Sequence, residues 1–136
     1  MNTKPYLTLA DAKQIGAAAE AEALANGWAV SIAIVDDGGH LLWQQRLDGA
    51  PPISSHIAPS KANTAALGRR ESKVYEDVIN GGRMSFLSAP KLEGMLEGGV
   101  PVIVDGHVIG AVGVSGVKSN EDVQIARAGI AALVTP

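Results

Sequence analysis

Three side chains near the middle of the sequence are of the types that bind carboxylates or carry protons: Arg46, His56 and Lys61. Arg46 offers a planar guanidinium that suits a carboxylate, unless it pairs with Asp48 two residues further along the same strand face. Lys61 either holds a carboxylate or lies along a helix contact with its ammonium reaching solvent. His56 is either a ligand or proton carrier or a solvated turn residue. Together these residues predict a site for a carboxylated molecule.

Glycines in the second half of the chain predict places where the backbone comes close to a partner. Gly98 and Gly99 precede a predicted strand, and Gly110, Gly113 and Gly116 lie along the strand that follows. Positions without a side chain let backbone amides approach a ligand or another segment. Their spacing matches neither a dinucleotide-binding glycine motif nor a phosphate loop, so nucleotide binding is not predicted.

The metal-binding residue types are sparse. The three histidines, His40, His56 and His107, lack the spacing of a protein metal site. His40 and His107 each follow a glycine-containing turn, where an exposed position at a strand edge is expected. The chain has no cysteine, which excludes disulfides and thiolate ligands. No metal site is therefore predicted.

The composition predicts one folded domain over residues 1–136, because this length is close to that of a typical domain. A net charge of −3, with no basic cluster beyond Arg69 and Arg70, argues against nucleic-acid binding. No stretch resembles a signal peptide or a membrane span, so no membrane contact and a cytoplasmic location are expected. Because 46% of the residues are hydrophobic and only 18% are charged, part of the apolar surface is expected to meet another subunit.

Periodicity and turn signals predict the elements that must position these residues. Pro59 is best tolerated in a first helical turn, so the second helix is expected to begin near Ile57. The first helix carries a stripe of small residues, including Gly16 and Ala19, that favours tight packing on a sheet, with an oligomer contact as the alternative. The predicted order is helix 8–27, hairpin 30–47 turning at Asp37–Gly39, helices 57–67 and 72–79, loop 80–99, hairpin 100–115 turning at Asp105–Gly106, and helix 119–134.

Two hairpins flanked by helices indicate an α/β protein of the α+β type, with one antiparallel sheet. The capping pair Ser119 and Asp122 is expected to begin the last helix, whose buried stripe runs from Val123 to Val134.

Four segments together resemble the GlcG/HbpS family of haem-degrading-type domains. They are VSIAIVDDGGHLLWQQRLDGAPP at 30–52, IAPSKANTAALGRR at 57–70, LEGGVPVIVDGHVIGAVGVSG at 96–116, and the helix at 122–133. The resemblance implies a profilin-like fold and homo-oligomers, dimeric or higher, with a ligand site near subunit contacts. It implies Arg46, Lys61, Glu97, Gly98 and Gly99 as ligand-binding positions, with His56 as a haem axial ligand or proton carrier.

Two functions follow from this resemblance together with the residues. The first is a ligand-binding protein that holds haem, another tetrapyrrole or a smaller carboxylated metabolite in a pocket between subunits. A single Phe, two Trp and two Tyr supply few aromatic side chains for a haem wall. The alternative is a metal-independent enzyme for a small hydroxy- or oxo-acid, with His56 or Glu97 as the base and Lys61 or Arg46 as the anchor. An accessory subunit of an oxidase complex is a third possibility.

Overall fold

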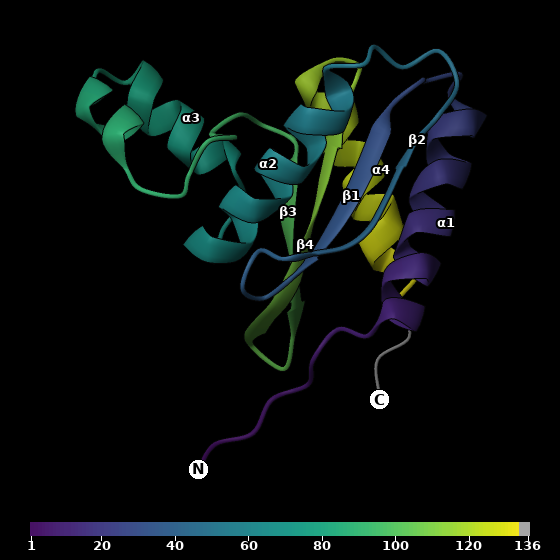
Figure 1. The fold of residues 1–136 in the computed structure, drawn as a ribbon, viewed down its shortest axis with the longest axis horizontal. Coiled ribbons are helices and arrows are strands. Elements are labelled where there is room, and N and C mark those ends of the chain that lie inside the picture. The colour runs from purple at the N-terminus through teal and green to yellow at the C-terminus, as the bar shows by residue number, and fades with distance from the viewer. Residues whose placement is uncertain (134–136) are drawn as a thin grey trace.

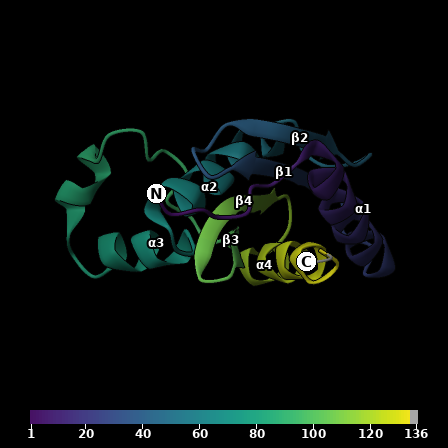
Figure 2. The same cartoon turned by 90° about the horizontal axis from the view of Figure 1, so that it is seen from below.

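The protein is built around a single four-stranded antiparallel sheet with strand order β2-β1-β4-β3. The computed structural model describes residues 1–133, and all statements below refer to them. Helices α1 and α4 pack together over one face of the sheet, and α2 covers the other (Figures 1 and 2). The elements are α1 (Leu9–Ala25), β1 (Ser31–Asp36), β2 (Leu41–Arg46), α2 (Ser54–Gly68), α3 (Lys73–Asn80), the 3-10 helix η1 (Met84–Ser88), β3 (Gly99–Val104), β4 (His107–Ser115) and α4 (Ser119–Ala131). The predicted α+β fold is confirmed.

Both predicted hairpins are present, and they meet through β1 and β4. β1 pairs with β2, β3 pairs with β4, and β1 and β4 pair with each other at the centre of the sheet. Asp105 has a positive φ of 52° and Gly106 of 78°, as the two-residue turn predicted there requires. The central strand β1 is buried on both faces, which explains why its apolar residues occupy both parities.

The small residues of α1 serve packing within the chain. The Thr8 hydroxyl accepts from the Asp11 amide and closes the predicted capping box. A Cβ at Gly16 would lie 3.0 Å from Trp43 of β2, and one at Gly129 of α4 would lie 3.1 Å from Ala19. These close contacts hold α1 against the sheet and α4, so Gly16 and Ala19 face the interior and not another subunit.

Helix α2 begins at Ser54, earlier than the position near Ile57 that was predicted, and Pro59 lies well inside it. Proline has no N–H, so the carbonyl oxygen of Ser55, four residues earlier, loses its helical donor. The side-chain amide of Gln44 on β2 donates to that oxygen at 2.7 Å. This replacement from the neighbouring strand is why the helix tolerates Pro59 in its interior.

Helix α2 also lies unusually close to the sheet. A Cβ at Gly113 of β4 would run into the backbone carbonyl of Ala58, and one at Gly99 of β3 into that of Lys61. Alanines fill most of the contact on the helix side, including Ala62. The segment that closely approaches Gly99 and Gly113 is therefore helix α2 of the same chain.

Residues 73–88, comprising α3 and η1, form an arm that projects from the body (Figure 1). No residue of either helix is buried, although Tyr75 and Phe86 stack with ring centroids 5.2 Å apart. The segment predicted as a loop at 80–99 thus contains the short helix η1. Apolar side chains on the arm remain exposed, among them Met84 and Leu87.

The last helix begins as predicted at Ser119 but is capped differently. The backbone amide of Lys118 donates to the Glu121 carboxylate, while Asp122 turns inward. Val123 and Ala126 are buried; Ile130 and Leu133 are partly buried, and Val134 lies outside the described residues.

Candidate functional site

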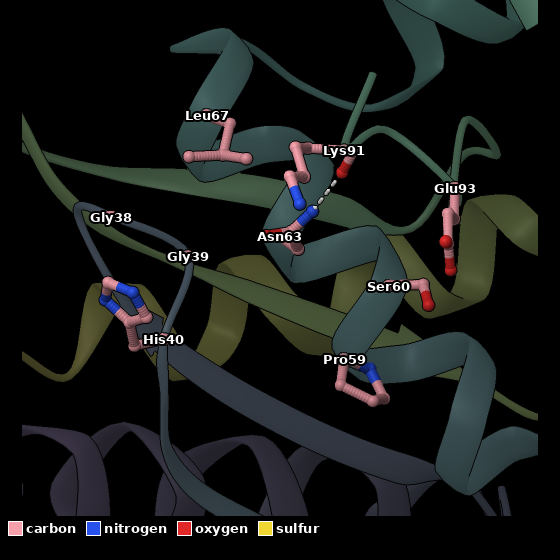
Figure 3. A pocket seen from close by; sticks show the side chains of 9 residues that line it. All are labelled: Gly38, Gly39, His40, Pro59, Ser60, Asn63, Leu67, Lys91 and Glu93. Carbon is pink, nitrogen blue, oxygen red and sulfur yellow. Dashed lines mark hydrogen bonds between the residues drawn. The ribbon is translucent and has the colours of Figure 1, made fainter. Parts of the chain in front are cut away.

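A hollow lies between the β1–β2 turn, α2 and the segment before β3. It has a volume of about 660 Å³ and is open on one side. We call it the turn hollow (Figure 3). It is lined by Gly38, Gly39, His40, Pro59, Ser60, Asn63, Leu67, Lys91 and Glu93. Its wall combines an imidazole, an ammonium, a carboxylate and neutral polar groups with the apolar Leu67 and Pro59.

His40 lies beside Asp36 across the turn, with its side chain 82% exposed. Its Nδ1 lies 3.2 Å from Oδ1 of Asp36, and its backbone amide donates to the same oxygen at 2.9 Å. A Cβ at Gly38 would lie 2.9 Å from Cε1 of the imidazole, so a side chain there would displace the exposed ring. Within residues 1–133 neither ring nitrogen forms a hydrogen bond, so Nε2 is open to a ligand. Histidines that bind metals usually have such a carboxylate on their other nitrogen.

Lys91 reaches the turn hollow from a backbone conformation that residues with side chains seldom adopt. Its φ is +65°, in the left-handed region where glycine is favoured. The Asn63 side chain donates to the Lys91 carbonyl at 2.7 Å and holds this conformation. Figure 3 shows the Lys91 side chain turned back toward Asn63, with His40 at the opposite rim. The hollow thus has a cation on one side and an imidazole on the other.

Lys61, a predicted carboxylate anchor, is placed in the interior. Its side chain is 4% exposed, and Nζ lies 3.2 Å from Oδ2 of Asp122 and 3.0 Å from the carbonyl oxygen of Val114. Burial raises the pKa of Asp122 to about 6, more than the neighbouring ammonium and the Val117 amide lower it. Through these contacts the Lys61 ammonium links α2 to α4 and β4, and it is buried away from the surface.

Gly98 and Gly99 belong to this same interior cluster. Gly98 has a φ of +137°, and a Cβ there would lie 2.6 Å from the Lys61 Nζ. Its carbonyl accepts from the Val114 amide, and the Gly99 amide donates to the Ser72 hydroxyl at 2.8 Å. Their amides and carbonyls are thus used to assemble the fold around Lys61.

The other predicted site residues are dispersed. Arg46 is exposed at the end of β2, His56 is exposed in the first turn of α2, and Glu97 lies in a separate hollow of about 270 Å³ beside α3 and α4. Within residues 1–133, no hydrogen bond or ion pair joins any two of Arg46, His56, Lys61 and Glu97, nor does one join Arg46 to Asp48. No such contact joins the base to the anchor of the alternative proton-transfer enzyme within these residues, and that alternative stays a prediction.

The residues that sequence reasoning missed are His40, Lys91 and Asn63. His40 is exposed, as expected, but it also lines the turn hollow. The signal that could have found it is Asp36, which precedes it by four residues across a Gly-Gly turn. Among the described residues, no group of three or more His, Asp or Glu side chains could hold a metal ion, and no helix is long and apolar enough to cross a membrane.

Comparison with known proteins shows consistent similarity over most of the chain. The family model described as "Haem degrading protein HbpS-like" matches residues 7–131. Protein GlcG of Escherichia coli strain K12 is 56% identical over 115 residues, which are 85% of each chain.

Two solved structures share the fold at 32% sequence identity. A double mutant of HbpS from Streptomyces reticuli superposes with a TM-score of 0.89, covering 99% of this chain and 92% of the other. A structure described as a PduOC:heme complex has a TM-score of 0.83 and covers 94% of this chain and 95% of the other.

Proposed function

This chain belongs to the HbpS-like family of haem-degrading proteins, and we propose that it is a ligand-binding protein whose ligand occupies the turn hollow. The ligand is haem or another tetrapyrrole or, failing that, a smaller carboxylated molecule. One observation carries the proposal: an imidazole beside a carboxylate and a strained lysine line the same 660 Å³ hollow.

The chemistry of the lining residues fits haem. His40 would bind the iron through Nε2, Lys91 would pair with a propionate, and Leu67 would contact the porphyrin. Bound haem would supply a redox-active iron. Asp36 would fix the imidazole orientation and increase its basicity as a ligand. A solved relative at 32% identity is described as a haem complex, which supports this choice.

Titration of the purified protein with haemin tests the proposal. We expect a shift of the Soret band at micromolar haemin, and at least tenfold weaker binding after His40→Ala. His56→Ala is the matched comparison, because His56 is an exposed histidine outside the turn hollow. Lys91→Gly should weaken binding less, because it removes one ion pair and keeps the backbone conformation.

The outcomes separate the alternatives. A Soret shift that survives His40→Ala but not His56→Ala would return the site to the histidine predicted from the sequence. No Soret shift in the unmodified protein would exclude haem. In that case a smaller carboxylated ligand is supported only if oxo- or hydroxy-acids raise the melting temperature of the protein and Lys91→Gly abolishes this increase. Without that increase the proposal fails.

We further propose that the chain forms a homo-oligomer, dimeric or higher, in the cytoplasm. The support is the arm, where Met84 and Leu87 are 59% and 58% exposed and no residue is buried by the rest of the chain. Light scattering at tens of micromolar should give at least twice 13.9 kDa, and Leu87→Glu should reduce that mass. A monomer in the unmodified protein would contradict this proposal, and cell fractionation tests the location.

A further inference from the structure

We propose that a hollow beside the β3–β4 turn is a second binding site, for a small dianion such as a phosphate group or a pair of neighbouring carboxylates. The hollow has a volume of about 440 Å³ and is lined by Lys4, Arg69, Ile103, Gly106, His107 and Val108. This site is distinct from the turn hollow and does not depend on what that hollow binds.

The charge of this hollow is positive in a chain whose net charge is −3. Lys4 and Arg69 are permanent cations at neutral pH, and the exposed His107 adds a donor. One carboxylate beside it is that of Asp37, which accepts a 2.5 Å hydrogen bond from Lys4. The residues that line the hollow include two cations and no carboxylate, although Asp105 directly precedes the lining residue Gly106.

Arg69 adopts a conformation that its own side chain disfavours. It follows α2 with a φ of +57°, in the left-handed region, at a position where helices usually have glycine. Glycine occurs one residue earlier, because a Cβ at Gly68 would run into the Tyr75 hydroxyl. Among the described residues, three that are not glycine have a positive φ: Arg69, Lys91 and Asp105. The hairpin turn explains Asp105. The other two are cations, and each of them lines a hollow. Strain retained at a cation beside a hollow indicates use of the side chain.

The guanidinium of Arg69 is held in place with donors to spare. Its Nη1 donates to the Asp37 carbonyl at 2.5 Å and to the Ala66 carbonyl at 3.1 Å. Within residues 1–133, no hydrogen bond is recorded from Nη2 or Nε. A guanidinium fixed on one side and free on the other suits two oxygens of an oxyanion, because its donors match that geometry. The ε-ammonium of Lys4 would supply the second charge.

A substitution that removes the charge without harming the backbone gives a sharp test. Arg69→Gly places the favoured residue at φ +57°, so the variant should melt no lower than the unmodified protein. We expect inorganic phosphate, titrated against chloride at equal ionic strength, to bind with at least tenfold lower affinity after Arg69→Gly. Phosphorus NMR line broadening measures the binding directly. Arg70→Gln is the matched control, because Arg70 is an exposed cation that lies over Tyr75 and not beside the hollow.

Parallel titration with succinate separates the two sources of the dianion. Tighter succinate binding assigns a dicarboxylate, and tighter phosphate binding assigns a phosphate compound. Equal loss of binding in Arg69→Gly and Arg70→Gln, or equal stabilisation by chloride, would overturn the proposal, because either result means general screening of charge. Retained affinity in Arg69→Gly would overturn it as well.

Discussion

The interface between α2 and the sheet and the open end around the β1–β2 turn use the same residue types in opposite ways. At the interface, a lysine and glycines are buried and serve close packing, as at Lys61 and Gly99. At the open end, a lysine and glycines border hollows, as at Lys91 and Gly39. A lysine near glycines in the sequence therefore predicts either a buried packing contact or the rim of a hollow. The two lysines differ in backbone conformation: Lys61 is helical, whereas Lys91 has a positive φ.

The largest effect is expected from removing one partner of the buried ion pair. Lys61→Met should destabilise the protein by about 3–5 kcal/mol near pH 8, because it leaves the Asp122 carboxylate buried without its cation. Denaturant unfolding measures the loss. Lys61→Met combined with Asp122→Leu should recover at least half of it, since the double variant buries no charge. A loss below about 1 kcal/mol would mean that Lys61 is available to a ligand after all.

The free energy of unfolding should depend on pH because of Asp122, the carboxylate of the same ion pair. The folded-state pKa of Asp122 is about 6, above its unfolded value of 3.8, so the folded protein binds this proton more tightly. The contribution of Asp122 is fully present below about pH 4 and is lost as the pH rises through 6. It amounts to about 3 kcal/mol at most, from the size of the shift. Asp122→Asn should remove this part of the pH profile, and an unchanged profile would contradict the assignment.

The close approach of α2 should make one glycine intolerant of any side chain. Gly113→Ala should cost about 3 kcal/mol, because its Cβ would meet the Ala58 carbonyl and the helix would have to move. Gly82→Ala on the arm is the comparison: it has a positive φ but no atom within 4 Å of the added Cβ, so it should cost about 1 kcal/mol. Equal losses in thermal or denaturant unfolding would contradict this prediction, because they would show that α2 accommodates the added methyl group at Gly113.

The smallest effect belongs to the open end and has the opposite sign. Lys91→Gly should leave the protein as stable as before or up to about 1 kcal/mol more stable, because glycine relieves the left-handed strain. Improved stability with weakened ligand binding would sharpen the contrast with Lys61. A loss above about 1 kcal/mol would assign Lys91 to the fold.

Local signals in the sequence were enough for the fold but not for the site. The Asp105-Gly106 turn and the Thr8 capping box depend on neighbours within four residues, so both could be predicted. The partner of Lys61 is Asp122, on another helix, and no local pattern shows that contact.

The same limit applies to the start of α2 and to Lys91. The rule that restricts Pro59 to a first turn is overridden by a hydrogen bond from Gln44 on a neighbouring strand. The positive φ of Lys91 has no sequence signal, since a glycine would be expected there.

The central pairing of β1 with β4 also sets the order in which the chain can fold. Asp36 pairs with Gly110 and Ser31 with Ser115, so the middle of the sheet joins segments far apart in sequence. The two hairpins can close locally, but the sheet cannot, because closing such a long loop carries an entropic cost that is recovered only when the pairing forms. During synthesis, the edge of β1 that pairs with β4 therefore stays without its partner until β4 has left the ribosome. The amino-terminal hairpin is thus the part of the nascent chain most in need of protection from aggregation.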